Sequence, residues 1–175
     1  MGELKFVITG TAGVGKSTAI ACISDVAPVV TDEETTDELR EIKNATTVAF
    51  DFGEVFLNDD TVVRIYGTPG QERFRHMWEI IADGALGLII LVDCTRNNPP
   101  SDLAMYIENF ADLIRETGMV VGLTRTEKIP DFETDRYFAV LEENNILCPV
   151  IEIDPRKRED VAMLLDTLMA ILEYN

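Results

Sequence analysis

The chain has 175 residues, of which 32 are acidic and 15 are basic, which gives a formal net charge of −17. This length predicts one domain, residues 1–175, with a core large enough to fold without disulfides or a structural metal. A chain this acidic, with no basic patch, argues against nucleic acid and anionic lipid as ligands. The charge serves either solubility alone or a docking face for a basic partner.

Cysteine use and hydrophobic runs favour a cytoplasmic protein. The three cysteines, Cys22, Cys94 and Cys148, lack metal-ligand spacing and are expected to be reduced and mostly buried. The longest apolar run, residues 85–92, is too short to span a bilayer and is predicted to be a strand. The first residues do not form a signal-peptide pattern, and neither end matches a lipidation motif, so we expect no direct membrane anchor.

Strand and helix patterns alternate along the chain. Strands are predicted at residues 4–9, 46–56, 61–66, 85–92, 119–123 and 149–153, and helices at 16–25, 73–82, 102–117, 133–144 and 157–173. Residues 58–60 form a short turn, so the second and third strands are expected to be antiparallel. The predicted fold is an α/β domain with a six-stranded, mostly parallel sheet, one antiparallel edge strand and helices on both faces.

Residues 10–17, Gly-Thr-Ala-Gly-Val-Gly-Lys-Ser, match the phosphate-binding loop pattern G-x-x-x-x-G-K-[ST] and lie between a predicted strand and a predicted helix. In this motif backbone N–H groups curl around the β-phosphate at the N-terminus of the helix. Lys16 would reach the β- and γ-phosphates, and the Ser17 hydroxyl would ligate Mg²⁺. The residues expected to contact phosphate here are Ala12, Gly13, Val14, Gly15, Lys16, Ser17 and Thr18. The chain is therefore predicted to be a P-loop NTPase.

Two irregular segments interrupt the alternation of strands and helices. Residues 26–45 form a long, acidic loop, and loops of this length in a compact domain are usually functional or disordered. Residues 66–74, Tyr-Gly-Thr-Pro-Gly-Gln-Glu-Arg-Phe, follow the third predicted strand.

Together these segments resemble a known family. The loop at 10–17, a threonine at the start of the second strand and the Thr-Pro-Gly-Gln-Glu-Arg-Phe block are similar, in order and spacing, to the first three sequence blocks of the Ras-like small GTPases. The Gly-Thr-Pro-Gly-Gln form resembles the prokaryotic Ras-like group that includes the MglA polarity switch and GTPases paired with roadblock-fold regulators. The resemblance implies a GTP/GDP-binding protein that uses Mg²⁺, hydrolyses GTP slowly and acts as a switch on a partner, either a roadblock-fold protein or a GTPase-activating protein.

The resemblance also assigns roles around the long loop. Thr47 would complete the Mg²⁺ ligands beside Ser17 and sense the γ-phosphate, with Thr46 as the alternative in register. The arrangement Thr-x-x-x-Asp-Phe that begins at Thr47 is similar to the eukaryotic pattern. Arg40 is the best candidate for a catalytic arginine supplied in cis, and its alternative is a solvated loop charge.

Hydrolysis would depend on three further residues. Lys16 would neutralise phosphate charge, Gly70 would offer its backbone N–H to the γ-phosphate, and Gln71 would orient the attacking water. Two departures from the family pattern bear on this. Gly67 stands where most relatives carry an Asp that holds a Mg²⁺-bound water, so Mg²⁺ is held less firmly or another carboxylate substitutes. Ala12 places a methyl group near the γ-phosphate, where the most active relatives have glycine.

Base recognition departs further from the pattern. Relatives read guanine with Asn-Lys-x-Asp after the fifth strand, where this chain has Thr124, Arg125, Thr126 and Glu127. Glu127 can accept hydrogen bonds from guanine N1–H and N2–H₂ and would repel the N1 lone pair of adenine. Arg125 can lay its planar guanidinium along the base. Guanine therefore remains the expected base.

A second base-contact segment is also altered. Relatives have Ser-Ala-Lys, whose alanine N–H donates to guanine O6, and this chain has Asp154, Pro155 and Arg156. Proline has no N–H to donate. Unless Arg156 supplies the donor, discrimination between bases should be reduced, because a lost buried hydrogen bond costs about 1 kcal/mol net.

The departures at Ala12 and Gly67 support an alternative function, a nucleotide-binding adaptor with negligible hydrolysis. A third candidate is a P-loop kinase for a small metabolite, although no arginine-rich lid or acceptor site is visible in the sequence.

Five further residues have predicted environments. His76 is expected on the surface, and Asp93, at the end of the fourth strand, is expected to be structural. Trp78, with Phe74 and Met77, either forms an apolar docking patch or packs beneath the neighbouring loop.

Overall fold

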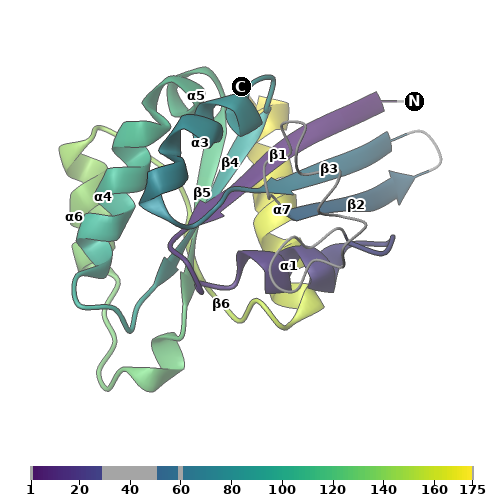
Figure 1. The fold of residues 1–175 in the computed structure, drawn as a ribbon. Helices are drawn as coiled ribbons and strands as arrows, with labels where there is room; N and C mark the ends of the chain where they lie inside the picture. The colour runs from purple at the N-terminus through teal and green to yellow at the C-terminus, as the bar shows by residue number, and fades with distance from the viewer. Residues whose placement is uncertain (1, 29–50, 59–60, 175) are drawn as a thin grey trace.

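The computed structural model describes residues 2–28, 51–58 and 61–174, which are drawn as ribbon in Figure 1. The predictions for Arg40, Thr46 and Thr47, and for the start of the second strand at residue 46, lie outside the described residues. None of the helices in the described part of the chain is long and apolar enough to cross a membrane.

The structure confirms the predicted α/β sheet. Its strands are β1 (Gly2–Gly10), β2 (Asp51–Asn58), β3 (Thr61–Gly67), β4 (Gly87–Asp93), β5 (Gly118–Thr124) and β6 (Val150–Ile153). The six strands lie in the order β2-β3-β1-β4-β5-β6. β2 and β3 pair antiparallel, and the other neighbours pair parallel. The antiparallel edge strand is thus the second, as the short turn after it predicts.

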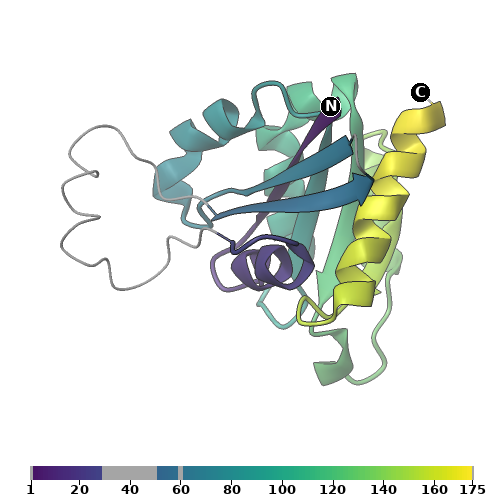
Figure 2. The same ribbon diagram turned by 90° about the vertical axis from the view of Figure 1, so that its right-hand side faces the viewer.

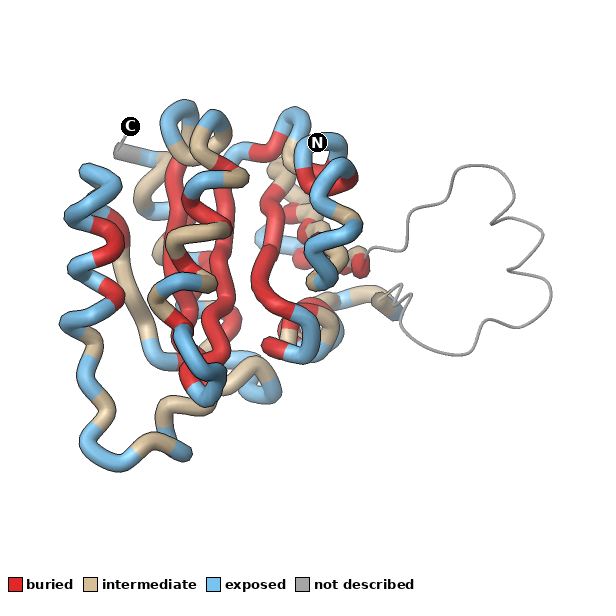
Figure 3. The backbone as a smooth tube through the Cα atoms, turned by 60° about the vertical axis from the view of Figure 1, so that its left-hand side comes forward, coloured by how far each residue is buried: buried red, intermediate tan, exposed pale blue. Residues whose placement is uncertain are grey.

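Helices cover both faces of this sheet. They are α1 (Lys16–Ile23), α3 (Arg75–Ala82), α4 (Pro99–Asn109), α5 (Ala111–Glu116), α6 (Asp135–Glu143) and α7 (Arg158–Tyr174), with short 3₁₀ turns at Glu72–Phe74 and Thr126–Lys128. α1 and α7 pack on one face, and α3, α4, α5 and α6 on the other (Figures 1 and 2). Such two-sided coverage buries the central strands over most of their length, as Figure 3 shows.

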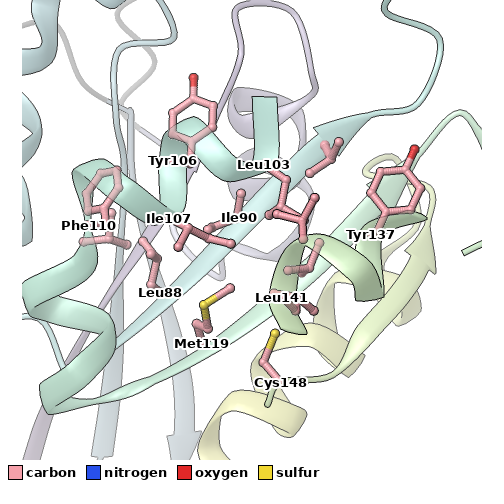
Figure 4. Close-up of a cluster of buried hydrophobic side chains, with 14 of the residues drawn as sticks. Leu88, Ile90, Leu103, Tyr106, Ile107, Phe110, Met119, Tyr137, Leu141 and Cys148 are labelled. Carbon is pink, nitrogen blue, oxygen red and sulfur yellow. The ribbon is translucent and has the colours of Figure 1, made fainter. Parts of the chain in front are cut away.

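Alternation along the strands divides the core into two clusters. Phe6 and Ile8 of β1 face α1 and α7, whereas Val7 faces the α4 side, because neighbouring side chains on a strand point to opposite faces. On the α4 side, Leu103 and Ile107 belong to the same buried cluster as Leu88 and Ile90 of β4, which Figure 4 shows. Packing on both faces fixes the positions of the strand ends, where the functional site lies.

One predicted helix, residues 102–117, is two helices in the structure. The first begins at Pro99, because the Asn98 side chain accepts from Ser101 N at 3.4 Å and proline suits the first helical turn. The helix ends at Asn109, because φ of −110° and ψ of 19° at Phe110 leave the α-helical region, and α5 starts at Ala111. Periodicity alone does not reveal this break, because the apolar spacing continues through it.

The segment around the single tryptophan also differs from its predicted single helix. Residues 72–74 form a 3₁₀ turn before α3 begins at Arg75. Met77 and Trp78 are buried at 7% and 1% exposure, and Phe74 is partly buried. The packing interpretation therefore holds for Met77 and Trp78, and the docking-patch interpretation is wrong for them. His76 is exposed, as expected.

The cysteines behave as the sequence predicts. All three are free, with Cys94 and Cys148 buried and Cys22 partly exposed. Burial raises the pKa of the Cys148 thiol to about 12 and also raises the pKa of Cys94. The two buried thiols therefore remain protonated and serve as small apolar groups in the core.

Candidate functional site

The candidate site lies at the carboxyl ends of the central strands. β1 ends at Gly10, β4 at Asp93 and β5 at Thr124, and all three are parallel neighbours in the sheet. Loops that leave this edge of an open α/β sheet form its ligand crevice. Every predicted site residue in the described part of the chain lies on these loops or at the N-terminus of α1.

The loop between β1 and α1 has the backbone of a phosphate cradle. Gly10, Gly13 and Gly15 have φ of 147°, 76° and 116°, a region that side chains rarely enter. A Cβ at Gly10 would lie 2.4 Å from Leu91 O, and one at Gly15 would lie 2.7 Å from Pro155 Cγ. Glycine is therefore required at both ends of the loop, for conformation and for space.

Lys16 lies across the mouth of this loop. Its Nζ donates to the carbonyl oxygens of Gly10 at 2.7 Å and Thr11 at 3.0 Å, and the residue is only 7% exposed. The ammonium group is thus held over the curled backbone, where it would meet phosphate oxygens. The predicted position of Lys16 agrees with this geometry.

Ser17 contacts a carboxylate that the sequence analysis did not place in the site. Its Oγ donates to Asp51 Oδ2 at 2.5 Å, and Asp51 is 7% exposed. Asp51 is the cross-strand partner of Gly67 in the β2–β3 pair. A Cβ built at Gly67 would lie 3.2 Å from Asp51 Cβ and 3.4 Å from Asp51 Oδ2. The carboxylate of Asp51 therefore fills the space that a carboxylate at position 67 would use.

Residues 68–70 lie directly on the phosphate loop. Thr68 N donates to Ile8 O at 3.0 Å, and the Thr68 hydroxyl is 2.7 Å from that of Thr9. A Cβ at Gly70 would lie 2.6 Å from both N and Cα of Ala12 and 2.8 Å from Lys16 Nζ. Only glycine can approach the loop this closely. Gln71 follows at once, exposed at the start of the 3₁₀ turn.

A cavity of about 290 Å³ adjoins the other side of the phosphate loop. Val14, Gly15 and Thr18 form its wall on the side of the loop and α1. The remaining lining includes all six residues that the sequence analysis assigns to base contact, which are Thr124, Arg125, Glu127, Asp154, Pro155 and Arg156. Two segments about thirty residues apart in sequence are thus brought together beside the loop.

Arg125 joins this cavity to the phosphate loop. Its backbone is left-handed, with φ of 61°, and its guanidinium donates to Gly13 O at 2.7 Å and to Asp93 Oδ2. Asp93 also accepts from the backbone N and the hydroxyl of Thr95, at 3.0 and 2.6 Å. Asp93 therefore orients a site residue as well as its own turn. Its place at the end of β4, paired with Thr124 of β5, was the available signal.

Arg156 is held by its own segment. Its backbone N and Nε donate to Asp154 Oδ1 at 3.0 and 2.8 Å, and its Nη2 donates to Oδ2 at 2.6 Å. These hydrogen bonds hold the pKa of the Asp154 carboxyl well below its usual value. The backbone N–H of Arg156 is therefore already satisfied and is a poor replacement for the donor that Pro155 lacks.

These loops define the class of protein. The site has the parts of a P-loop α/β domain, which are strand β1, a glycine-rich loop followed by Lys16 and Ser17, and helix α1. Residues 68–70 lie on this loop, and the cavity of about 290 Å³ adjoins it. The chain belongs to the family described as "Conserved hypothetical ATP binding protein", which matches residues 8–173.

Individual relatives are more distant. An uncharacterized protein of Methanocaldococcus jannaschii is 27% identical over 128 residues, which are 73% of this chain and 66% of that protein. Ras-related protein Rab-4A of Bos taurus is 26% identical over 79% of this chain and 58% of its own length. Ras-related protein RABA6a of Arabidopsis thaliana is 29% identical over 67% of this chain and 46% of its own.

A solved structure supports the fold. The bacterial selenocysteine-specific elongation factor EF-Sec matches with a TM-score of 0.69 at 21% identity, over 100% of this chain and 29% of that one. The chain spans between 46% and 66% of the length of the three relatives above. The Ras-related matches bear out the expected likeness to Ras-like proteins, and the narrower likeness to the MglA group stays a prediction.

The bridge made by Arg125 gives the first testable expectation. Arg125→Ala would separate the cavity from Gly13 O and leave Asp93 without its cation, so we expect affinity for nucleoside diphosphates to fall roughly tenfold or more. Fluorescence titration with a labelled diphosphate measures this, after thermal melting has shown that the variant is folded.

The matched control is Arg115→Ala. Arg115 pairs with Asp112 on α5 with side chains 71% and 90% exposed, and exposed pairs of this kind contribute little. Equal affinities in the two variants would contradict a bridging role for Arg125.

Proposed function

We propose that the protein is a small GTP-binding protein that hydrolyses GTP slowly to GDP and phosphate and acts as a conformational switch for a protein partner. The observation that carries this proposal is the contact of residues 68–70 with the phosphate loop, because it joins a segment bearing Gln71 to the place where a γ-phosphate would bind. The Ras-related matches support the same class of protein.

Guanine is the base that the cavity chemistry favours. Glu127 lines the cavity, and its carboxylate can accept from N1–H and N2–H₂ of guanine but would face the N1 lone pair of adenine. The family description names ATP, so the base is the part of the proposal that most needs measurement. The hydrogen bonds within Asp154 and Arg156 agree with the expected loss of a donor to O6, and hence with modest selectivity.

The residues beside the loop fit a magnesium ion. Ser17 supplies a hydroxyl and Asp51 a carboxylate next to it, and hard oxygen ligands of this kind suit Mg²⁺. Magnesium would neutralise charge on the β- and γ-phosphates. Asp51 would hold a metal-bound water, in place of the carboxylate missing at Gly67. Thr47 is the further candidate ligand.

The proposed hydrolysis depends on residues that position the phosphates and the attacking water. Lys16 neutralises phosphate charge, Gly70 offers its backbone N–H, and Gln71 orients the water. Without an arginine supplied by a partner, turnover is expected on the order of 10⁻⁴ to 10⁻² per second. The methyl group of Ala12 crowds the same space. A roadblock-fold protein or a GTPase-activating protein is the proposed partner, and the cytoplasm is the proposed location.

Two other functions remain as candidates. Ala12 and Gly67 favour a nucleotide-binding adaptor with negligible hydrolysis, because a methyl group near the γ-phosphate and the missing acid at position 67 would both restrain hydrolysis. A small-metabolite kinase is the third, and stimulation of GTP turnover by a metabolite pool would support it.

Base selectivity is tested with diphosphates. We expect GDP to bind roughly tenfold more tightly than ADP, and Glu127→Gln to narrow this gap by weakening GDP, because it removes a charged acceptor. Isothermal titration with and without Mg²⁺ measures both affinities. The control Glu143→Gln removes one negative charge from an exposed position on α6 and should leave the ratio of GDP to ADP affinity unchanged. Equal binding of GDP and ADP by the wild type would overturn the guanine assignment.

Hydrolysis is tested by single turnover of GTP. Gln71→Leu should slow phosphate release roughly tenfold or more and leave GDP affinity nearly unchanged, because it removes only the group that orients water. Glu72→Ala, the exposed neighbour, is the control and should retain the rate. Absence of phosphate release in the wild type, with and without cell extract, would reject the switch and favour the adaptor.

The magnesium role of Asp51 is tested by binding alone. The measured quantity is the ratio of GDP dissociation constants in EDTA and in Mg²⁺. Asp51→Asn should lower this ratio by about tenfold, the usual scale for residues that support a metal ligand. In EDTA the variant should bind GDP at least as tightly as the wild type, because a negative charge near the phosphates has been removed.

A double variant makes this test specific. Asp51→Gly combined with Gly67→Asp moves the carboxylate to the partner position across the strand pair, and we expect it to regain most of the ratio that Asp51→Gly alone loses. The control is Asp102→Asn, which removes the α4 carboxylate that pairs with Arg96. An unchanged ratio in Asp51→Asn would refute the role of Asp51.

A further inference from the structure

Trp78 is tied to the segment that lies on the phosphate loop. It is the only tryptophan in the chain, it is 1% exposed, and its Nε1 donates to Pro69 O at 2.8 Å. Pro69 directly precedes Gly70, the residue packed against Ala12. A movement of Gly70 away from the loop therefore acts on the hydrogen bond of the indole.

The other side of the indole touches the break between α4 and α5. The ring of Phe110 is stacked on it, with centroids 5.7 Å apart and planes at 15°, and the Tyr106 ring lies 5.0 Å away. Phe110 lies between the two helices: α4 ends at the residue before it, and α5 begins at the residue after it. Tyr106 and Phe110 both extend from the end of α4 in the cluster of Figure 4. The indole is thus in contact with the least regular point of this helical layer.

A γ-phosphate would compete with Gly70 for space. The Cβ position of Gly70 lies 2.6 Å from the backbone of Ala12 and 2.8 Å from Lys16 Nζ, so the segment is already in van der Waals contact with the loop. A third phosphate above Lys16 requires this segment to move outward. The described arrangement is therefore the one expected with a diphosphate.

Two buried hydroxyls support a second arrangement. Among the described side chains, Thr11 Oγ1 and Tyr106 Oη are buried without a hydrogen-bond partner. Thr11 belongs to the phosphate loop, and Tyr106 packs on Trp78. Buried polar atoms are rarely left unpaired, so each of these two hydroxyls is expected to find a partner in another arrangement of its surroundings or in a bound water. One unpaired hydroxyl thus lies on the phosphate loop, and the other lies on a residue that packs against the indole.

We propose that Trp78 relays the presence of a γ-phosphate at Gly70 to the break between α4 and α5. This inference rests on the proposed GTP-binding function. The indole follows Pro69 O through its hydrogen bond when residues 68–70 move, so its stack on Phe110 changes with the nucleotide. α5 forms part of the wall of a groove of about 840 Å³ with Ala111, Ile114 and Arg115, and the relay alters the shape of this groove.

Amide hydrogen exchange tests the relay, and the fluorescence of Trp78 is a second, intrinsic reporter. The amides of Phe110, Ile114 and Thr117 donate to Tyr106 O, Phe110 O and Leu113 O at 3.0, 2.9 and 3.0 Å, at the break and along α5. Their exchange rates are compared in the GDP complex and in the complex with a non-hydrolysable GTP analogue, both with Mg²⁺. We expect the rates to differ roughly threefold or more between the complexes, together with a change in Trp78 emission.

Two phenylalanine variants separate a relay from simple packing. Phe110→Leu keeps an apolar side chain but removes the stack, so both nucleotides should still bind and the exchange difference at residues 111–117 should be lost. Phe132→Leu removes a comparable aromatic contact with Tyr137, at a centroid distance of 6.1 Å, and should retain the difference.

Each outcome decides the inference. A difference that persists in Phe110→Leu refutes the relay, as does the absence of any difference in the wild type when both nucleotides are shown to bind. Failure of the wild type to bind either nucleotide refutes the proposed function and the relay with it. Because binding is measured separately, the two failures are distinguishable.

Discussion

Close packing at three glycines, which have no side chain, holds this site together. The phosphate loop packs so closely on its neighbours that added Cβ atoms would lie 2.4 Å from Leu91 O at Gly10, 2.7 Å from Pro155 Cγ at Gly15 and 2.6 Å from Ala12 N at Gly70. These contacts fix the loop to β4, to the base-side segment and to the segment after β3. Glycine at each of them is what allows three loops from different strands to meet around one ligand position. The regular core on both faces of the sheet serves to hold those strand ends in register.

The arrangement of the strands, and not nearness in sequence, brings the carboxylates of the site to their partners. Asp51 reaches Ser17 from the antiparallel strand, opposite Gly67. Asp93 reaches Arg125 from the end of a parallel neighbour. Asp93 and Arg125 lie at the ends of neighbouring strands, whereas Asp51 lies on β2 and meets Ser17 at the start of α1, which packs on β2 and β3. The chain therefore lacks an acid at Gly67 but still presents a carboxylate, that of Asp51, beside Ser17.

The sequence predicts what depends on local pattern and misses what depends on contacts between strands. Strand number, sheet type and the phosphate loop follow from hydrophobic alternation and glycine spacing. The six base-side residues also meet as predicted, because both segments leave the same edge of the sheet. The role of Asp51 was missed because its signal is a cross-strand register, which the sequence does not contain. The break at Phe110 was missed because the apolar period continues through it, and the stacked indole that occupies it comes from another helix.

In the proposed cycle, switching and slow hydrolysis follow from the same contact. With Gly70 against the backbone of Ala12, a γ-phosphate enters only if residues 68–70 move, so triphosphate and diphosphate favour different positions of that segment. A ligand shifts such an equilibrium only by its difference in affinity for the two states. Gln71 is exposed in the described arrangement and must be brought to the phosphate before water can attack. We propose that the displaced state then persists until a partner completes the site, and that this persistence gives the partner time to recognise it.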